Sequence, residues 1–217
     1  QHEPRSLTII EKDNRLAQEL KLEYSNKRKI KVINDDVLKI DLENILSKNS
    51  TIIGNLPYNI SSQILVKMIK FENWPPKYTD LVFMFQKEMS QRILGSFKTK
   101  NYGRLSILTN FRLHIVKKFN VSPNCFFPKP KVTSTVIHLA PKMKINYNIS
   151  NIENLEFITN NFFSNKRKKI NKKIKEIFNP EQINRFKDLN LNNRPSDLKK
   201  EFYYQAVEIY ESGWFEL

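Results

Sequence analysis

Apolar residues follow two different spacings along the first part of the chain. Short apolar runs, which predict buried strands, occur at 7–11, 30–33, 51–54 and 81–86. Between these runs, apolar positions recur at helical spacing over about 14–24, 61–70 and 87–94. Alternation of strands with helices is typical of an α/β fold, which we predict for this part of the chain.

The pattern changes in the second half of the chain. It predicts one more helix and a closing pair of strands, at 103–114, 115–121 and 132–139. After Pro141 strand signals stop and the apolar residues take helical spacing. We therefore predict a Rossmann-like α/β domain over 1–141, and a small all-α domain over 142–217 that binds RNA.

The charge of the chain favours a polyanionic partner. Lys and Arg number 37 against 22 Asp and Glu, a net charge of +15. Such an excess promotes binding to nucleic acid through release of counterions. The alternative is a compositional bias, which the many Asn and Ile residues also indicate.

One segment is especially basic. The run Lys166–Lys175 is predicted to be helical, with Ile170, Ile174 and Ile177 on one apolar stripe. Its lysines then form a solvated face, which either binds RNA phosphates or only keeps the helix soluble.

Other chemistries receive little support from the sequence. Cys125 is the only cysteine, so an intramolecular disulfide is impossible and a reducing, cytoplasmic setting is the simplest interpretation. The three histidines have no metal-ligand spacing, and we predict no metal site. No run approaches the ~18 apolar residues of a membrane span, so we expect no membrane partner.

The segment Asn55-Leu56-Pro57-Tyr58 directly follows one predicted strand and suits methylation of an amino group on a base. The amino nitrogen of adenine is a poor nucleophile because its lone pair is delocalised into the ring. Two acceptors aimed at the amino hydrogens localise that pair: the Asn55 side-chain oxygen and the backbone carbonyl of Leu56 or Pro57. Tyr58 can stack on the base. The alternative is an ordinary strand-ending turn with an aromatic cap.

The wider segment resembles the catalytic loop of the ribosomal RNA adenine-N6 dimethyltransferases, which use S-adenosylmethionine. The matching string is Ile53-Gly54-Asn55-Leu56-Pro57-Tyr58-Asn59-Ile60-Ser61-Ser62. Further matches to that family follow in the same order, at Phe83–Glu88, Tyr102–Ser106, Val121–Val132 and Arg194–Leu198. The resemblance therefore spans nearly the whole chain.

This resemblance implies the residues that bind the cofactor. Glu11, which closes the second strand of the family's sheet, is the implied ribose ligand; without the neighbouring motif it is an ordinary surface glutamate. Asp36 is implied to contact the adenine amino group, with Asp35 as the competing register, and Val37 and Asn55 complete the set.

The same resemblance implies an RNA-facing surface. Phe126, in a loop stiffened by prolines, is the implied stacking partner of the flipped target base; core packing is the alternative for Phe126 and Phe127. The predicted RNA-binding residues are Arg104, Lys129, Lys131, Lys166, Arg167, Lys168, Lys169, Lys172 and Lys173.

One family feature is absent from the sequence. The glycine-rich loop that carries the cofactor's amino-acid portion is expected just before Leu7, and the four glycines of the chain are scattered singly. We therefore expect that the natural protein begins before Gln1 and that these 217 residues alone are inactive.

The predicted function is double methylation of adenosine N6 in small-subunit ribosomal RNA during ribosome biogenesis, by a monomer that takes methyl groups from S-adenosylmethionine. Asn55, Leu56, Pro57, Tyr58 and Phe126 are the predicted catalytic residues. Two alternatives remain: a DNA adenine-N6 methyltransferase, which uses a similar loop, and a non-catalytic RNA-binding assembly factor.

Overall fold

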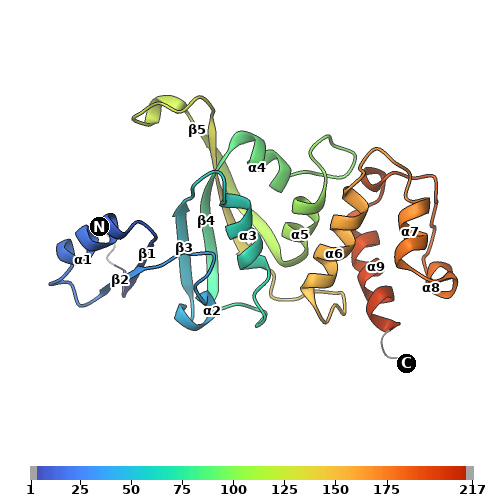
Figure 1. Cartoon of the computed structure of the whole chain (residues 1–217), viewed down its shortest axis with the longest axis horizontal. Helices are drawn as coiled ribbons and strands as arrows, with labels where there is room; N and C mark the ends of the chain where they lie inside the picture. Colours follow the sequence, from blue (N-terminus) through green and yellow to red (C-terminus); the bar gives the residue numbers. More distant parts are fainter. Residues whose placement is uncertain (1–3, 214–217) are drawn as a thin grey trace. The chain divides into compact units, whose positions relative to one another are not determined.

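The computed structural model describes residues 4–213 and divides into two compact units, Gln1–Ser47 and Lys48–Leu217. Each unit is described by itself (Figure 1). The first unit contains β1 (Leu7–Glu11), α1 (Asn14–Glu23), β2 (Ile30–Asn34) and α2 (Leu42–Ile45).

The first unit is a βαβ arrangement. β1 and β2 are parallel, with a register that runs from Leu7 opposite Ile30 to Glu11 opposite Asn34. The helix between them begins after Asp13, whose side chain accepts a hydrogen bond from the Leu16 amide and so caps the helix. Because the strands are parallel, the residues that follow each strand lie at the same edge.

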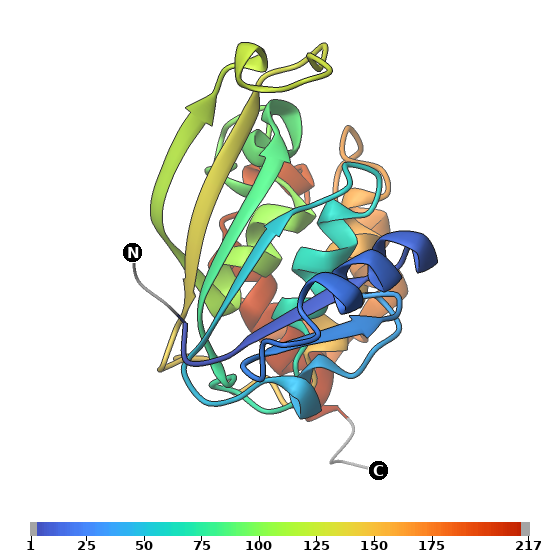
Figure 2. The same ribbon diagram turned by 90° about the vertical axis from the view of Figure 1, so that its left-hand side faces the viewer.

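The second unit is a four-stranded sheet with helices. Its elements are β3 (Ser50–Asn55), α3 (Ser61–Ile69), β4 (Tyr78–Gln86), α4 (Lys87–Ile93), α5 (Arg104–Arg112), β5 (Leu113–Val121), the 3-10 helix Pro123–Cys125, β6 (Ser134–Pro141), α6 (Ile152–Phe163), α7 (Asn171–Ile177), α8 (Pro180–Asn184), the 3-10 helix Pro195–Asp197 and α9 (Lys200–Ser212). The strand order is β3-β4-β6-β5, with β3 parallel to β4 and the other neighbours antiparallel (Figure 2).

Helices cover one face of this sheet, where α3, α4 and α5 lie beside it (Figure 1). Alternate residues of β4 and β6, including Phe83, Phe85 and Ile137, are fully buried there. The residues between them are half-buried, because successive side chains of a strand point to opposite faces of the sheet. The outer edge strand β3 leaves Ile53 with 76% of its surface exposed.

The carboxy-terminal helices form a further layer of the second unit. α6 and α9 contact each other, and α6 also contacts α5. The Tyr204 hydroxyl of α9 donates to the Ile107 carbonyl of α5 at 3.0 Å. The helical region therefore shares a compact unit with the four-stranded sheet. A domain boundary between residues 141 and 142 stays a prediction, although the last strand does end at Pro141.

The prediction of a helix through the whole basic run was wrong for its first part. Residues 166 and 167 lie in a turn and residue 168 in a bend, and α7 begins only at Asn171. The Lys166 ammonium donates to two backbone carbonyls of a distant loop, while the Ile170 amide donates to the Asn193 carbonyl at 2.9 Å instead of to a preceding helical turn. Ile170 and Ile174 are nevertheless buried, as their spacing predicts.

Candidate active site

The Asn-Leu-Pro-Tyr segment leaves the sheet at the carboxyl end of β3. Asn55 is the last residue of that strand and pairs with Met84 of β4. The neighbouring antiparallel strand β6 begins at the same edge, because Ser134 pairs with Gln86. The Asn55 side chain is exposed at this edge and is available to a ligand.

A contact across the sheet edge fixes the loop. The hydroxyls of Tyr58 and Ser134 lie 3.2 Å apart, within hydrogen-bond distance. Ser61, the first residue of α3, donates its hydroxyl to the Tyr58 carbonyl at 3.1 Å. Tyr58 is therefore held at its ring tip and at its backbone. The sequence did not reveal Ser134, which lies 76 positions away in an ordinary alternating strand.

The loop distinguishes its two candidate backbone acceptors. The Pro57 carbonyl already accepts a hydrogen bond from the Ile60 amide at 3.2 Å. Within residues 4–213, by contrast, no donor is bonded to the Leu56 carbonyl. The Leu56 side chain folds back over Gly54, where an added Cβ would lie 2.4 Å from a Leu56 methyl carbon. A larger residue at that position would have to displace the Leu56 side chain.

In the first unit, two predicted cofactor ligands follow the ends of the paired strands. The Glu11 carboxylate accepts from the Asp13 amide at 2.7 Å through Oε1. Asp36 accepts from the Leu38 amide through Oδ1 and from the Lys12 ammonium through Oδ2, each at 2.9 Å. The Lys12 hydrogen bond, followed by that of Leu38, holds the pKa of Asp36 below its ordinary value.

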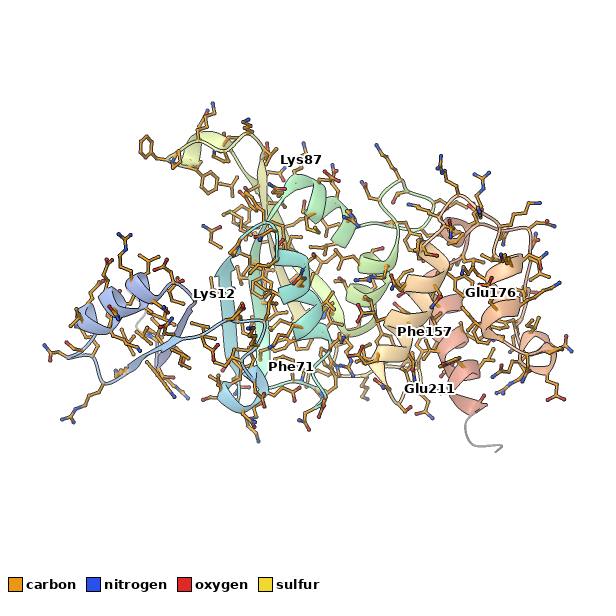
Figure 3. The ribbon with its side chains drawn as sticks, in the orientation of Figure 1. Lys12, Phe71, Lys87, Phe157, Glu176 and Glu211 are labelled. Atoms are coloured by element: carbon orange, nitrogen blue, oxygen red, sulfur yellow. The ribbon has the colours of Figure 1, made fainter. Side chains whose placement is uncertain are left out.

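Asp36 and Asp35, the two candidates for the contact with the adenine amino group of the cofactor, differ in their surroundings. Asp36 is half-buried, whereas Asp35 is exposed and its side chain accepts from the Asp36 amide at 2.6 Å. Val37 is also half-buried. The sequence pattern did not single out Lys12, although a lysine directly after an acidic strand end is a local signal that could have indicated it. It lies on the first unit beside that strand end (Figure 3).

The loop between β5 and β6 carries the predicted base-stacking residue. Phe126 is half-buried and its amide donates to the Pro123 carbonyl at 3.2 Å. Phe127 is fully exposed, and Lys129 and Lys131 are exposed. Core packing, the alternative for both phenylalanines, is therefore wrong for Phe127, because its ring has no contact that removes it from solvent.

Five of the predicted RNA-binding cations have protein partners. Arg104 lies 3.4 Å from a Glu156 carboxylate oxygen, and Lys166 donates to the carbonyls of Lys100 and Tyr102. Lys169 donates to the Asn192 side-chain oxygen at 2.9 Å. Lys172 and Lys173 lie 3.8 and 2.8 Å from Glu176 carboxylate oxygens. The cations of the basic run are exposed or half-buried. Four of them border a cavity of about 120 Å³ together with Glu176; they are Lys168, Lys169, Lys172 and Lys173.

Within residues 4–213, no group of three or more His, Cys, Asp and Glu side chains is placed to hold a metal ion. None of the helices in this range is both long enough and apolar enough to cross a membrane.

The acidic strand ends of a βαβ unit and an Asn-Leu-Pro-Tyr loop at a strand's carboxyl end define a Rossmann-like methyltransferase. The chain belongs to the ribosomal RNA adenine dimethylase family, whose model matches residues 2–212. It is 38% identical to ribosomal RNA small subunit methyltransferase A of Pelagibacter ubique, over 96% of this chain and 79% of the relative. The enzyme of the same name in Malacoplasma penetrans is 38% identical over 95% of this chain and 75% of its own length.

Solved structures agree in fold. A dimethyladenosine transferase from Plasmodium falciparum superposes with a TM-score of 0.72 at 23% identity, covering 96% of this chain and 83% of that one. The 23S rRNA methyltransferase ErmE superposes with a TM-score of 0.64 at 21% identity, with the same coverage of each chain. These likenesses establish the Rossmann-like methyltransferase fold predicted from the sequence.

Proposed function

We propose that this protein dimethylates adenosine N6 in small-subunit ribosomal RNA, with S-adenosylmethionine as the methyl donor. The observation that carries the proposal is the exposed Asn55 amide at the carboxyl end of β3, in a loop anchored through Tyr58 to Ser134. The names of the relatives from Pelagibacter and Malacoplasma support the choice of substrate.

The loop supports activation of an amino group. Asn55 Oδ1 accepts one hydrogen of the adenine amine, and the Leu56 carbonyl accepts the other, because the Pro57 carbonyl is already bonded to Ile60. These two bonds draw the amine out of conjugation and direct its lone pair. The ring of Tyr58, tethered at both ends, provides the face on which the base stacks. Positioning and electrostatics supply the rate acceleration.

The acidic residues of the first unit fit the nucleoside part of the cofactor. Glu11 keeps Oε2 available to accept from ribose hydroxyls, since the Asp13 amide occupies only Oε1. Asp36 is held ionised by Lys12, which suits acceptance from the adenine amine, and Val37 offers apolar surface beside it. S-adenosylmethionine supplies an electrophilic methyl group when bound. Asp36 rather than Asp35 is favoured because the Lys12 and Leu38 contacts fix its orientation.

RNA binding is supported by charge in two places. Lys129 and Lys131 are exposed in the β5–β6 loop next to Phe126. The lysine-lined cavity at the start of α7 is suited to backbone phosphates, because its four lysines outnumber the single Glu176. We expect the protein to act as a monomer in the cytoplasm.

The test is transfer of isotopically labelled methyl to unmethylated small ribosomal subunits, followed by nucleoside analysis of the RNA. Dimethyladenosine supports the proposal, and label in duplex DNA but not in the subunits indicates a DNA methyltransferase instead. Binding of subunits without transfer indicates an assembly factor.

The Asn55→Ala variant tests the mechanism. We expect it to lower methyl transfer at least 100-fold while RNA binding changes little, because the lost acceptor acts mainly in the transition state (on the order of 3 kcal/mol). An equal loss of binding and transfer would contradict the assigned role. The Asn59→Ala variant is the matched control, since it removes an exposed amide of the same loop.

A further inference from the structure

The most exposed large apolar side chain in the described part of the chain is Phe127. Its relative exposure is 102%, whereas its neighbour Phe126 is half-buried. A phenyl ring held in water is unfavourable, so a fully exposed one in a defined loop points to a ligand that covers it. Only Phe126 is expected to stack on the target base, and the proposed methyl transfer does not use Phe127.

The loop presents Phe127 at the catalytic edge of the sheet. β5 ends at Val121 and β6 begins at Ser134, and these two residues pair with each other. Ser134 also contacts the Tyr58 hydroxyl of the catalytic loop. In Figure 1 the loop extends beyond the end of β5. The loop therefore leaves the sheet at the same edge as the segment expected to bind the target base.

The loop is stiff, which suits a stacking surface. Prolines at 123, 128 and 130 fix backbone angles, and the Ser122 side chain accepts from the Asn124 amide at 3.3 Å. A ring whose backbone is already restricted loses little entropy when a base stacks on it.

The charge beside Phe127 selects the partner. Lys129 and Lys131 are both exposed, and no acidic residue lies between Val121 and Pro141. Exposed aromatic faces combined with cations are the features with which proteins bind single-stranded nucleic acid. An apolar protein surface would account for the exposed ring but not for the two lysines. An acidic protein would account for the lysines but not for the ring.

We infer that Phe127 stacks on an unpaired base adjacent to the target adenosine, while Lys129 and Lys131 contact the flanking phosphates. Phe126 and Phe127 then bind two different bases of one RNA strand. The inference rests on the proposed methyl transfer and adds a determinant of substrate sequence and structure: a single-stranded neighbour next to the modified base.

Steady-state methyl transfer to unmethylated small subunits tests this role. We expect Phe127→Ala and Phe127→Leu to raise KM on the order of tenfold with kcat nearly unchanged, and Phe127→Trp to retain the wild-type KM, because stacking needs an aromatic face. A packing role would be rescued by leucine instead. Met143→Ala is the matched control, since it removes a side chain that is 71% exposed beyond the opposite end of β6. An unchanged KM in Phe127→Ala would overturn the inference.

A binding measurement separates this inference from the proposed function. The Phe127→Trp protein is titrated with single-stranded oligoadenylate, and stacking is expected to quench an added fluorescence component that the wild-type protein lacks. Absence of methyl transfer by the wild-type protein of natural length would contradict the proposed function, whereas the quenching still reports on stacking. Binding of oligoadenylate without quenching would show that the stacking role is wrong. The same conclusion would follow if Phe127→Ala weakened binding to subunits that retain their proteins but not binding to single-stranded RNA.

Discussion

Glu211 joins the end of α9 to the start of α6 and provides a test of what holds the helical region together (Figure 3). The residue is only 8% exposed. Oε2 accepts from the Ser150 amide and hydroxyl at 2.7 and 2.8 Å, and Oε1 accepts from the Asn151 amide and the Asn154 side chain at 3.1 and 2.8 Å. An anion there also interacts favourably with the N-terminus of α6.

The expected magnitude follows from these contacts. Hydrogen bonds to a charged group contribute about 1.5–3 kcal/mol each when considered singly. Ser150 and Asn151 are exposed, however, so their donors regain water when the carboxylate is removed. We therefore expect Glu211→Ala to lower the free energy of unfolding by about 2 kcal/mol rather than by the sum of the bonds, and the melting temperature by about 4–8 °C. Glu211→Gln, which keeps one acceptor oxygen, is expected to cost about half as much.

The effect depends on pH. Burial alone would raise the pKa of Glu211, but hydrogen bonds from Asn154, Ser150 and Asn151 outweigh it and lower the pKa. A lowered pKa means that the stabilisation is complete above the unfolded value of about 4.3 and is lost as pH falls through the folded value. The difference between wild type and Glu211→Gln is therefore expected to be constant from pH 7 to pH 5 and to shrink below pH 4.

Denaturant unfolding followed by circular dichroism measures these differences. Glu208→Ala is the matched control, because Glu208 lies one turn earlier on α9 and accepts a single hydrogen bond, from the Asn148 amide at 2.7 Å. A loss below about 0.5 kcal/mol in Glu211→Ala, or a loss no larger than that of the control, would refute the reasoning.

Three further predictions concern the site and its loop. Tyr58→Phe removes the hydroxyl that contacts Ser134, so kcat for methyl transfer is expected to fall about 3- to 10-fold at unchanged stability, and Ser134→Ala should match it; additive losses in the double variant would contradict a direct contact. Lys12→Ala removes the largest cause of the lowered pKa of Asp36, which should therefore rise in an NMR titration of the carboxyl group and weaken cofactor binding; an unmoved pKa would contradict the ion pair. Gly95→Ala places a Cβ 2.4 Å from a backbone oxygen of the following loop. Because the main chain there cannot easily move away, the substitution should lower the free energy of unfolding by about 1–3 kcal/mol, measured by thermal unfolding. A wild-type melting temperature would show that the loop adjusts.

The sequence predicted most of the regular elements closely. The strand 7–11 has the predicted bounds, and α4 ends within a residue of its predicted limit. These elements were predictable because strand and helix periodicities are local properties of the chain. Local periodicity predicted a helix through the basic run, and that prediction was wrong for the first residues of the run. The Lys166 side chain there donates to carbonyls 64 and 66 residues away, and the segment forms a turn. A pattern of charges does not encode such a distant partner.

The sequence by itself determined the α/β class, the family and the Asn55–Tyr58 segment, because residue types and spacing within short strings are sufficient for each. Only the tertiary structure decided that Ser134 anchors Tyr58, that the Pro57 carbonyl accepts a hydrogen bond from the Ile60 amide, and that Phe127 is far more exposed to solvent than Phe126. The physical reason is that a hydrogen bond or a solvent-exposed face depends on which distant segments pack together. The pairing of β3 with β4 and of β4 with β6 brings Ser134 to Tyr58, 76 positions away, and no local pattern of the sequence contains that contact.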